Sequence, residues 1–172
     1  MLSFDELNLL KSQVEMGVMP TEALEDEFEE MLIDLYLMGF ADVQKLVETE
    51  PNAKDLREAV FRKFDGKDFR DRLREHSGNV PDTLRVLDTD ANRVYQAGQY
   101  DAAKRSGEKL FKTWRTMEDP KVRDTHDYLE GMKVPVEDDF YTYDGDHAPY
   151  PGAFEMASNN VNCRCGIDIT KD

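Results

Sequence analysis

The sequence has few of the residues that most often carry chemistry or cross-links. Its 172 residues include two cysteines, three histidines and one tryptophan. Cys163 and Cys165 are separated by a single residue, and a disulfide bridge between such close neighbours would be strained. A disulfide-stabilised fold is therefore excluded, and both thiols are expected to be reduced and buried.

Long apolar runs are also lacking. No segment approaches the roughly 20 apolar residues that a membrane-spanning helix needs. The first residues, with Asp5 and Glu6, lack the basic start and apolar core of a signal peptide. No membrane association is expected, and the protein should act in the cytosol or reach its destination without a signal peptide.

Basic residues are scarce in the first 50 residues, which hold 13 Asp and Glu against only Lys11 and Lys45. This segment carries most of the net charge of −15. An acidic surface repels phosphate and anionic lipid, so direct nucleic-acid binding is not expected, whereas a basic protein partner would be attracted. Ordinary solvated helix faces are the alternative explanation of the charge. A third, mimicry of nucleic acid, has no support elsewhere in the sequence.

Helical periodicity dominates the first two thirds of the chain. Residues 1–20 are expected to form an N-terminal tail, and residues 21–107 a helical region. Within it, a long helix should start at Thr21 and carry an apolar stripe to Val47, with a kink at Gly39. Two shorter helices should follow, and a second long helix should open at Asn79 and stop near Gly107, with small residues that permit close packing.

The apolar stripe of the first long helix has two interpretations. Flanked by charge of one sign, it would suit docking into a groove of a partner protein. Alternatively, it completes the core of the protein itself.

The pattern changes in residues 108–172, which are expected to form an α+β module. Residues 110–116 favour a strand, Asp119 and Pro120 would begin a helix that ends at Gly131, and residues 132–136 would form a short strand before a loop. Residues 163–169 then alternate between apolar and polar, as in a half-buried strand. The expected fold is α+β, with a mainly helical N-terminal part packed on a small module of short strands.

The rare residues of this module occur in an ordered set of motifs. The set consists of Trp114-Arg115-Thr116, Arg123-Asp124-Thr125-His126, Leu129-Glu130-Gly131, Tyr150-Pro151-Gly152 and Asn162-Cys163-Arg164-Cys165. In this order the motifs resemble the phage Mu protein F-like family of minor head proteins, also called phage head morphogenesis proteins. The resemblance is strongest from about residue 85 to residue 169.

The resemblance implies a protein of the phage head, assembled in the cytoplasm of the bacterial host and present in few copies. Its implied role is head morphogenesis or genome delivery, and its implied partners are portal, capsid and scaffolding proteins. Some members of the family carry a C-terminal toxin domain. Because this sequence stops at Asp172, no such domain is expected here.

The family name supplies no active site, so no catalytic residue, cofactor or metal is assigned. The motif residues are expected to be structural: Trp114, Arg115, Arg123, Asp124, His126, Gly131, Asn162, Cys163, Arg164 and Cys165. Among them, the arginines and Asp124 should form a buried or half-buried polar network, because paired Arg and carboxylate groups specify geometry well.

Two chemical alternatives involve the histidines. Cys163 and Cys165 with His126 and His147 could form a tetrahedral zinc site, but the single-residue gap between the thiols is shorter than in common zinc motifs. His126 is more simply a hydrogen-bonded structural residue. A metal-free nuclease would use His126 and His147 as acid and base, with Arg115 or Arg123 on the phosphate. The net negative charge would hinder such an enzyme from binding its polyanionic substrate.

Overall fold

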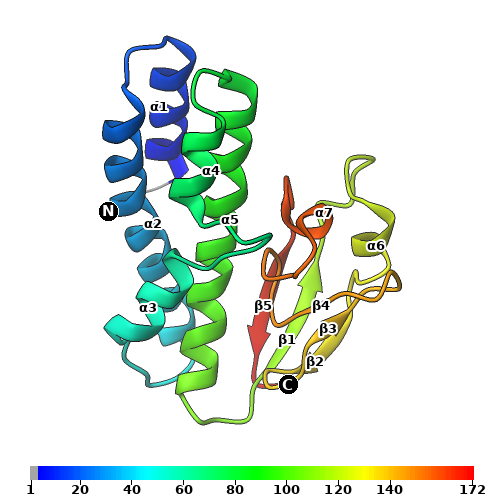
Figure 1. Ribbon diagram of the computed structural model, residues 1–172. Helices are drawn as coiled ribbons and strands as arrows, with labels where there is room; N and C mark the ends of the chain where they lie inside the picture. The colour runs from blue at the N-terminus through cyan, green and yellow to red at the C-terminus, as the bar shows by residue number, and fades with distance from the viewer. Residues whose placement is uncertain (1–3) are drawn as a thin grey trace.

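The structure is a computed structural model that describes residues 4–172. Its first part is helical, and its second part contains short antiparallel strands, so the predicted α+β class is confirmed (Figure 1). The helices of the first part are α1 (Phe4–Glu15), α2 (Thr21–Gln44), α3 (Ala53–Val60), α4 (Phe69–Glu75) and α5 (Val80–Arg105).

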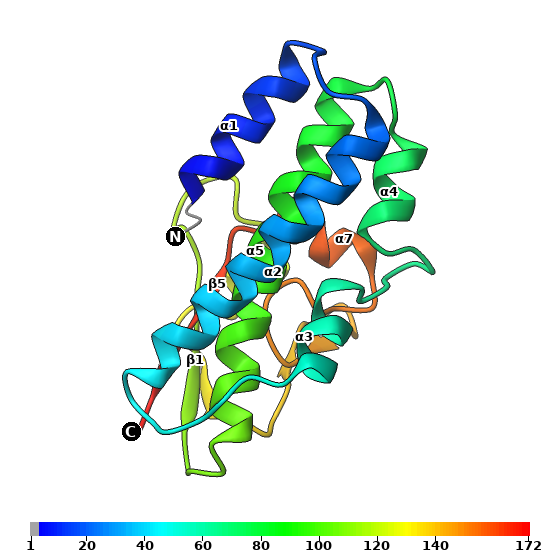
Figure 2. The same ribbon diagram turned by 90° about the vertical axis from the view of Figure 1, so that its left-hand side faces the viewer.

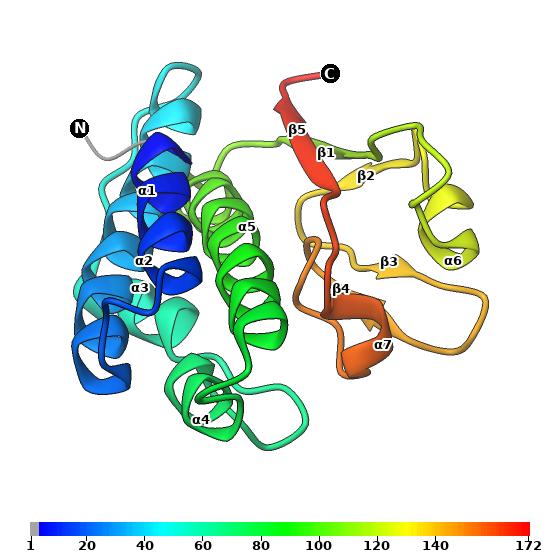
Figure 3. The same ribbon diagram turned by 90° about the horizontal axis from the view of Figure 1, so that it is seen from above.

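The second part consists of two small sheets and two short helices. Its elements are β1 (Phe111–Arg115), α6 (Asp124–Asp127), β2 (Lys133–Pro135), β3 (Phe140–Tyr141), β4 (His147–Ala148), α7 (Ala157–Asn160) and β5 (Gly166–Thr170). One sheet has the antiparallel order β2-β1-β5, and β3 pairs with β4 in the other. Helix α5 lies between α2 and the larger sheet, so it contacts both parts of the protein (Figure 3).

The apolar stripe of α2 lies inside the protein. Phe28, Leu32 and Leu35 are fully buried, and Met31 and Val43 are nearly so. The stripe therefore completes the protein's own core, and the docking interpretation of it is wrong. The helix begins at Thr21 as predicted, with Pro20 as its N-cap residue, and the Thr21 hydroxyl lies 2.7 Å from the Ser77 hydroxyl.

Two glycines allow α2 and α5 to approach closely. A β-carbon at Gly39 would lie 2.2 Å from the carbonyl oxygen of Tyr95, and one at Gly98 would lie 2.1 Å from that of Tyr36. Both distances are far below van der Waals contact, so neither position has room for a side chain. The helix continues through Gly39, whose role is this close approach rather than an interruption of α2.

The segment predicted as a tail contains a helix. In α1, Leu7 and Leu10 are buried, and the Lys11 ammonium donates to the Asp88 carboxylate at 2.9 Å. Helix α1 contacts α5, and Figure 2 shows it to one side of α2 and α5 in the upper half of the helical part. The two buried leucines of α1 are too few to form a stripe that predicts a helix from the sequence.

The helix predicted over residues 119–131 is also wrong, because only Asp124–Asp127 is helical. Glu118 has a positive φ of 52°, which turns the chain before Asp119. The Asp119 carboxylate accepts from the Lys121 backbone N–H at 3.0 Å and pairs with Arg164. These local bonds take the place of a helix cap.

A buried ionic cluster joins α4 to α5. The carboxylate of Asp90 is fully buried and accepts from Arg72 at 2.6 and 2.7 Å and from Arg93 at 3.0 Å. Arg93 is itself fully buried and also donates to the carbonyl oxygens of Ala59 and Val60 at the end of α3. Through Asp90 and Arg93, the cluster therefore connects α3, α4 and α5.

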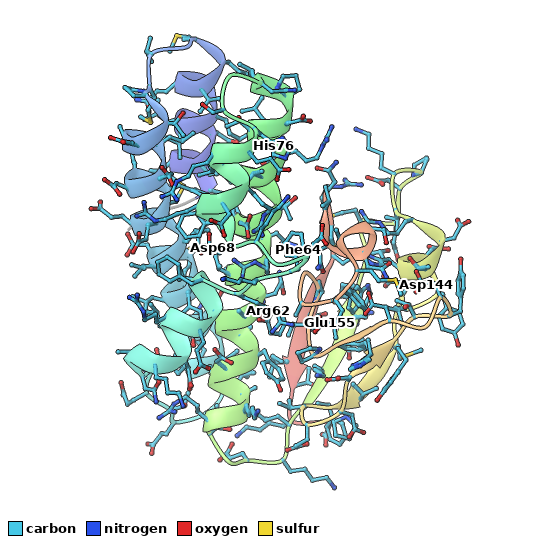
Figure 4. The ribbon with its side chains drawn as sticks, viewed as in Figure 1. Arg62, Phe64, Asp68, His76, Asp144 and Glu155 are labelled. Carbon is cyan, nitrogen blue, oxygen red and sulfur yellow. The ribbon has the colours of Figure 1, made fainter. Side chains whose placement is uncertain are left out.

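The loop between α3 and α4 connects the two parts of the protein. Arg62 donates to the carbonyl oxygen of Ala153 in the second part at 2.8 Å. Phe64 is buried, with the Arg72 guanidinium 4.0 Å from its ring centroid. Figure 4 shows Arg62 and Phe64 on the loop that extends from the helices towards the second part.

A carboxylate at the α2–α5 contact should make stability depend on pH. The Tyr36 hydroxyl donates to Asp101 at 2.6 Å, and burial raises the pKa of Asp101 to about 6. Because the unfolded chain has the ordinary, lower pKa, the folded state binds the proton more tightly. The contribution of this protonation to stability is complete only below the ordinary pKa of 3.8, and it is lost as the pH rises from there through about 6.

Asp101→Asn should remove that dependence. We expect chemical denaturation from pH 4 to pH 7 to show a smaller loss of unfolding free energy in the variant than in the wild-type protein. Identical slopes in the two proteins would contradict the raised pKa of Asp101.

Candidate functional site: the Trp114–His126–Cys cluster

The single tryptophan is the centre of an aromatic cluster in the second part. Trp114 lies on β1, the central strand, and is fully buried. Its ring packs edge-on against His126 and Phe140, with centroid separations of 5.4 and 5.0 Å, and is tilted against Phe154 at 5.9 Å. Thus three segments that are distant in the sequence meet around one side chain.

The histidine of this cluster faces both cysteines. His126 lies on α6 with 1% of its surface exposed, and its ring stacks on Phe154 with centroids 5.4 Å apart. Its Nδ1 atom is 3.5 Å from Sγ of Cys163 and 3.7 Å from Sγ of Cys165. Its Nε2 atom is also buried, and none of the described residues forms a hydrogen bond with it. The histidine is thus a buried residue oriented towards sulfur.

Both cysteines are free and buried, as predicted. The interaction between the two thiols lowers the pKa of Cys163, while the same interaction, with burial, raises the pKa of Cys165. Negative charge is therefore accommodated better on Cys163. The alternating burial expected for residues 163–169 is present, although the strand itself begins only at Gly166.

Helix α5 binds the backbone of the cysteine segment through polar side chains. The Asn92 amide donates to the carbonyl oxygens of Cys163 at 3.2 Å and Cys165 at 2.9 Å. The side-chain oxygen of Gln96 accepts from the Ile167 N–H at 3.0 Å, and the Thr89 hydroxyl accepts from the Asn162 N–H at 3.0 Å. Asn162 has a positive φ of 60°, which turns the chain into this segment.

The part that these α5 residues play in binding the cysteine segment was not predicted from the sequence. Thr89, Asn92 and Gln96 occur at helical spacing on one face of α5, and that recurrence is the signal that could have found them.

The predicted arginine network is more exposed than expected. Arg164 makes a bidentate pair with Asp119 at 2.7 and 2.8 Å, and Arg115 donates to Asp168 at 2.8 Å across the β1–β5 pair. Arg115 and Arg164 are half-exposed, so solvent screens both pairs and neither should add much to the stability of the fold. Gly131, the other motif residue, has a φ of 75°, and its N–H donates to the carbonyl oxygen of Trp114 at 2.9 Å.

Asp124 is not part of that network, which corrects the prediction. It is exposed at the start of α6. Arg123, its neighbour, donates instead to the carbonyl oxygens of Ser158 and Val161 and so connects α6 to the segment before the cysteines.

These positions predict different effects for two neighbouring substitutions. Arg123→Ala should lower the unfolding free energy by about 1–3 kcal/mol, because two carbonyl oxygens lose a charged donor. Asp124→Ala, the matched control, should change it by less than about 0.5 kcal/mol, as at most surface positions. Thermal and urea denaturation of both variants would measure this, and equal effects would contradict the assignment.

The two histidines of the nuclease hypothesis occupy different environments. His147 lies on the β3–β4 hairpin, half-exposed, with Nδ1 2.7 Å from Asp139 and its ring stacked on Tyr141. His126 is enclosed by aromatic rings and the cysteines. No group of metal-ligating side chains among residues 4–172 includes His147, so its proposed place beside the cysteines is not supported.

A buried carboxylate stabilises the loop that covers the cluster. Asp146 accepts from the N–H groups of His147, Glu155 and Met156 and from the Asn159 amide, at 2.9–3.2 Å. Figure 4 shows Asp144 and Glu155 in the loops of this second part. The Asn159 amide also contacts Asp144 at 3.3 Å. Residues 142–160 are thereby held in place, and Phe154 within this segment contacts the Trp114 ring.

The cluster lies within a segment of the chain that is similar to known proteins. A family model described as "Phage Mu protein F like protein" matches residues 53–168, from α3 to β5. The chain is 36% identical over 110 residues to "NAD(+)--arginine ADP-ribosyltransferase EFV" of Enterococcus faecalis, covering 59% of this chain and 22% of that protein. It is 30% identical over 81 residues to "Minor head protein GP7" of Bacillus phage SPP1, covering 46% of this chain and 26% of that protein. No solved structure matches it significantly.

Proposed function

Because the chain belongs to the phage Mu protein F-like family, we propose that it is a minor, capsid-associated head protein that acts in head morphogenesis of a tailed phage or prophage. The observation that carries this proposal is the family match, which includes the whole Trp114–His126–Cys cluster and the helix that binds it. Similarity to a minor head protein of phage SPP1 supports it. The protein would then be found in the virion, after assembly in the bacterial cytoplasm.

The negative charge on the outer face of α2 favours binding to a basic protein, which we propose is one of the portal, capsid or scaffolding proteins. Glu27, Glu30 and Asp34 lie at helical spacing on the side of α2 that faces away from the core. Among the described residues, no cation pairs with these three, whereas Asp26 and Glu29 are neutralised by Arg70. A stripe of unpaired negative charge attracts a positively charged partner and repels DNA.

In the described part of the chain, residues 4–172, none of the helices has the length and apolar character of a membrane span.

One relative is named as an ADP-ribosyltransferase, but we do not propose this enzymatic activity for the present chain. That relative is matched over about a fifth of its length, and here His126 is buried among aromatic and sulfur atoms. We propose that the shared segment serves association with the phage particle rather than transfer chemistry. The purified chain is expected to leave NAD+ intact, and consumption of NAD+ would contradict this part of the proposal.

The proposal is tested with phage heads. Heads purified from cells that make the protein should contain it by mass spectrometry, and heads made without it should be fewer or defective in DNA content. A triple variant, Glu27→Lys, Glu30→Lys and Asp34→Lys, should stay folded but fail to enter heads. The control carries the same charge change at Glu118, Asp124 and Asp127 and should still enter. Absence of the wild-type protein from heads would overturn the proposal.

A further inference from the structure

The three donor atoms of the cluster have the spacing of a metal site. Nδ1 of His126 and Sγ of Cys163 and Cys165 all lie within 4.8 Å of one another, and all three residues are buried. Zinc binds sulfur at about 2.3 Å and imidazole nitrogen at about 2.0–2.1 Å in tetrahedral geometry, which places nitrogen about 3.5 Å from each sulfur. The observed separations of 3.5 and 3.7 Å agree with that value.

We propose that His126, Cys163 and Cys165 bind one zinc ion. From the sequence, these three residues with His147 were a possible zinc site, which the single-residue gap between the cysteines disfavoured. The fold supplies the third ligand from 37 residues earlier in the chain, on α6. A single zinc ion would connect α6 directly to the segment that enters β5.

The chemistry of the three donors favours zinc over magnesium or calcium. Thiolate and imidazole are soft or borderline ligands, whereas magnesium and calcium require oxygen ligands. Two thiolates and a neutral imidazole would neutralise the charge of a divalent ion, so the complex adds no net charge to an apolar environment. Binding at Nδ1 also sets the tautomer of His126, because the ring proton must then lie on Nε2.

The fourth coordination position would face a small hollow beside the cluster. Besides the three ligands, its lining includes Met117, Lys121, Arg123 and Asn162. Among residues 4–172, no fourth histidine, cysteine or carboxylate joins the group. We therefore assign this position to a water molecule. A zinc site with three protein ligands and one water is chemically complete.

The first experiment measures metal in the intact protein. Protein purified without chelator should contain one zinc ion per chain by mass spectrometry under native conditions, and chelator should lower its melting temperature. Replacement of zinc by Co2+ should produce a sulfur-to-cobalt charge-transfer band. Since Cys163 and Cys165 are the only cysteines in the sequence, that band can arise from no other residues.

The second experiment uses substitutions. Cys163→Ser, Cys165→Ser and His126→Gln should each lose stoichiometric zinc, while His147→Gln, the matched control on the β3–β4 hairpin, should retain it. If a ligand variant fails to fold, the cobalt spectrum of the wild-type protein still decides the question. A wild-type protein that contains no zinc, shows no charge-transfer band and melts at the same temperature with chelator would overturn the proposal.

Discussion

Gly98→Ala is expected to destabilise the protein by about 2–3 kcal/mol, because an added β-carbon forces a closely packed contact apart. The new atom would lie 2.1 Å from the carbonyl oxygen of Tyr36, which belongs to the backbone of α2 and cannot rotate away. Helix propensity alone predicts the opposite sign, since alanine is favoured over glycine by about 1 kcal/mol inside a helix. The sign of the change therefore distinguishes packing from propensity.

Thermal denaturation measures this effect. A loss of this size should lower the melting temperature by roughly 4–12 °C, since 1 kcal/mol corresponds to about 2–4 °C in a domain of this length. Ala41→Gly is the matched control, because Ala41 is exposed on α2 two residues after Gly39. It should lose only the propensity difference of about 1 kcal/mol. A Gly98→Ala protein that melts above the wild type would disprove the close contact of α2 and α5.

Asp90→Asn should cause a larger loss, about 3–5 kcal/mol, because it leaves two buried guanidinium groups without their counter-charge. Arg93 is fully buried, and Arg72 is nearly so. Neither group can recover hydration without opening the contact between α4 and α5. Urea denaturation should show a reduced midpoint, and the proportion of unfolded protein at 37 °C should rise.

The control for Asp90 lies two residues away on the same helix. Asp88 pairs with Lys11, but its side chain is 47% exposed. Asp88→Asn should therefore cost no more than about 1 kcal/mol. Comparable losses in the two variants would show that Asp90 is hydrated and that the ionic cluster is not a buried one.

The parts of the fold that follow periodic patterns could be predicted from the sequence. The stripes of α2 and α5 recur over many turns, so both helices could be predicted, although the pattern alone did not show whether the α2 stripe faces the core or a partner. The bounds of α6 could not be predicted, because a capping residue followed by proline, as in Asp119-Pro120, also occurs where no helix begins. Here the turn at Glu118 and the pairing of Asp119 with Arg164 decide the outcome. Arg164 lies 45 positions further along the chain, so only the fold brings it near Asp119.

The sequence pointed to the residues of the candidate site, but not to their arrangement in space. The rarity of Trp114, His126 and the cysteines drew attention to them, and the structure brings all four together. Exposure of Asp124 was missed because an Arg-Asp motif does not reveal which side chain points inward. The buried Arg72, Asp90 and Arg93 were missed for the same reason, since charged residues on a helix usually face solvent.

The order of the larger sheet has a consequence for when the protein folds. Its central strand, β1, pairs Phe111 with Thr170 and Arg115 with Gly166 on β5. The helical part can collapse while the chain is still being synthesised, because its contacts need only residues that have already left the ribosome. Trp114 and the cysteines cannot assemble until residues 163–170 have emerged. A nascent chain that ends before residue 163 would therefore present a folded helical part with an open sheet edge, and the Trp114–His126–Cys cluster would form only after residues 163–170 have left the ribosome.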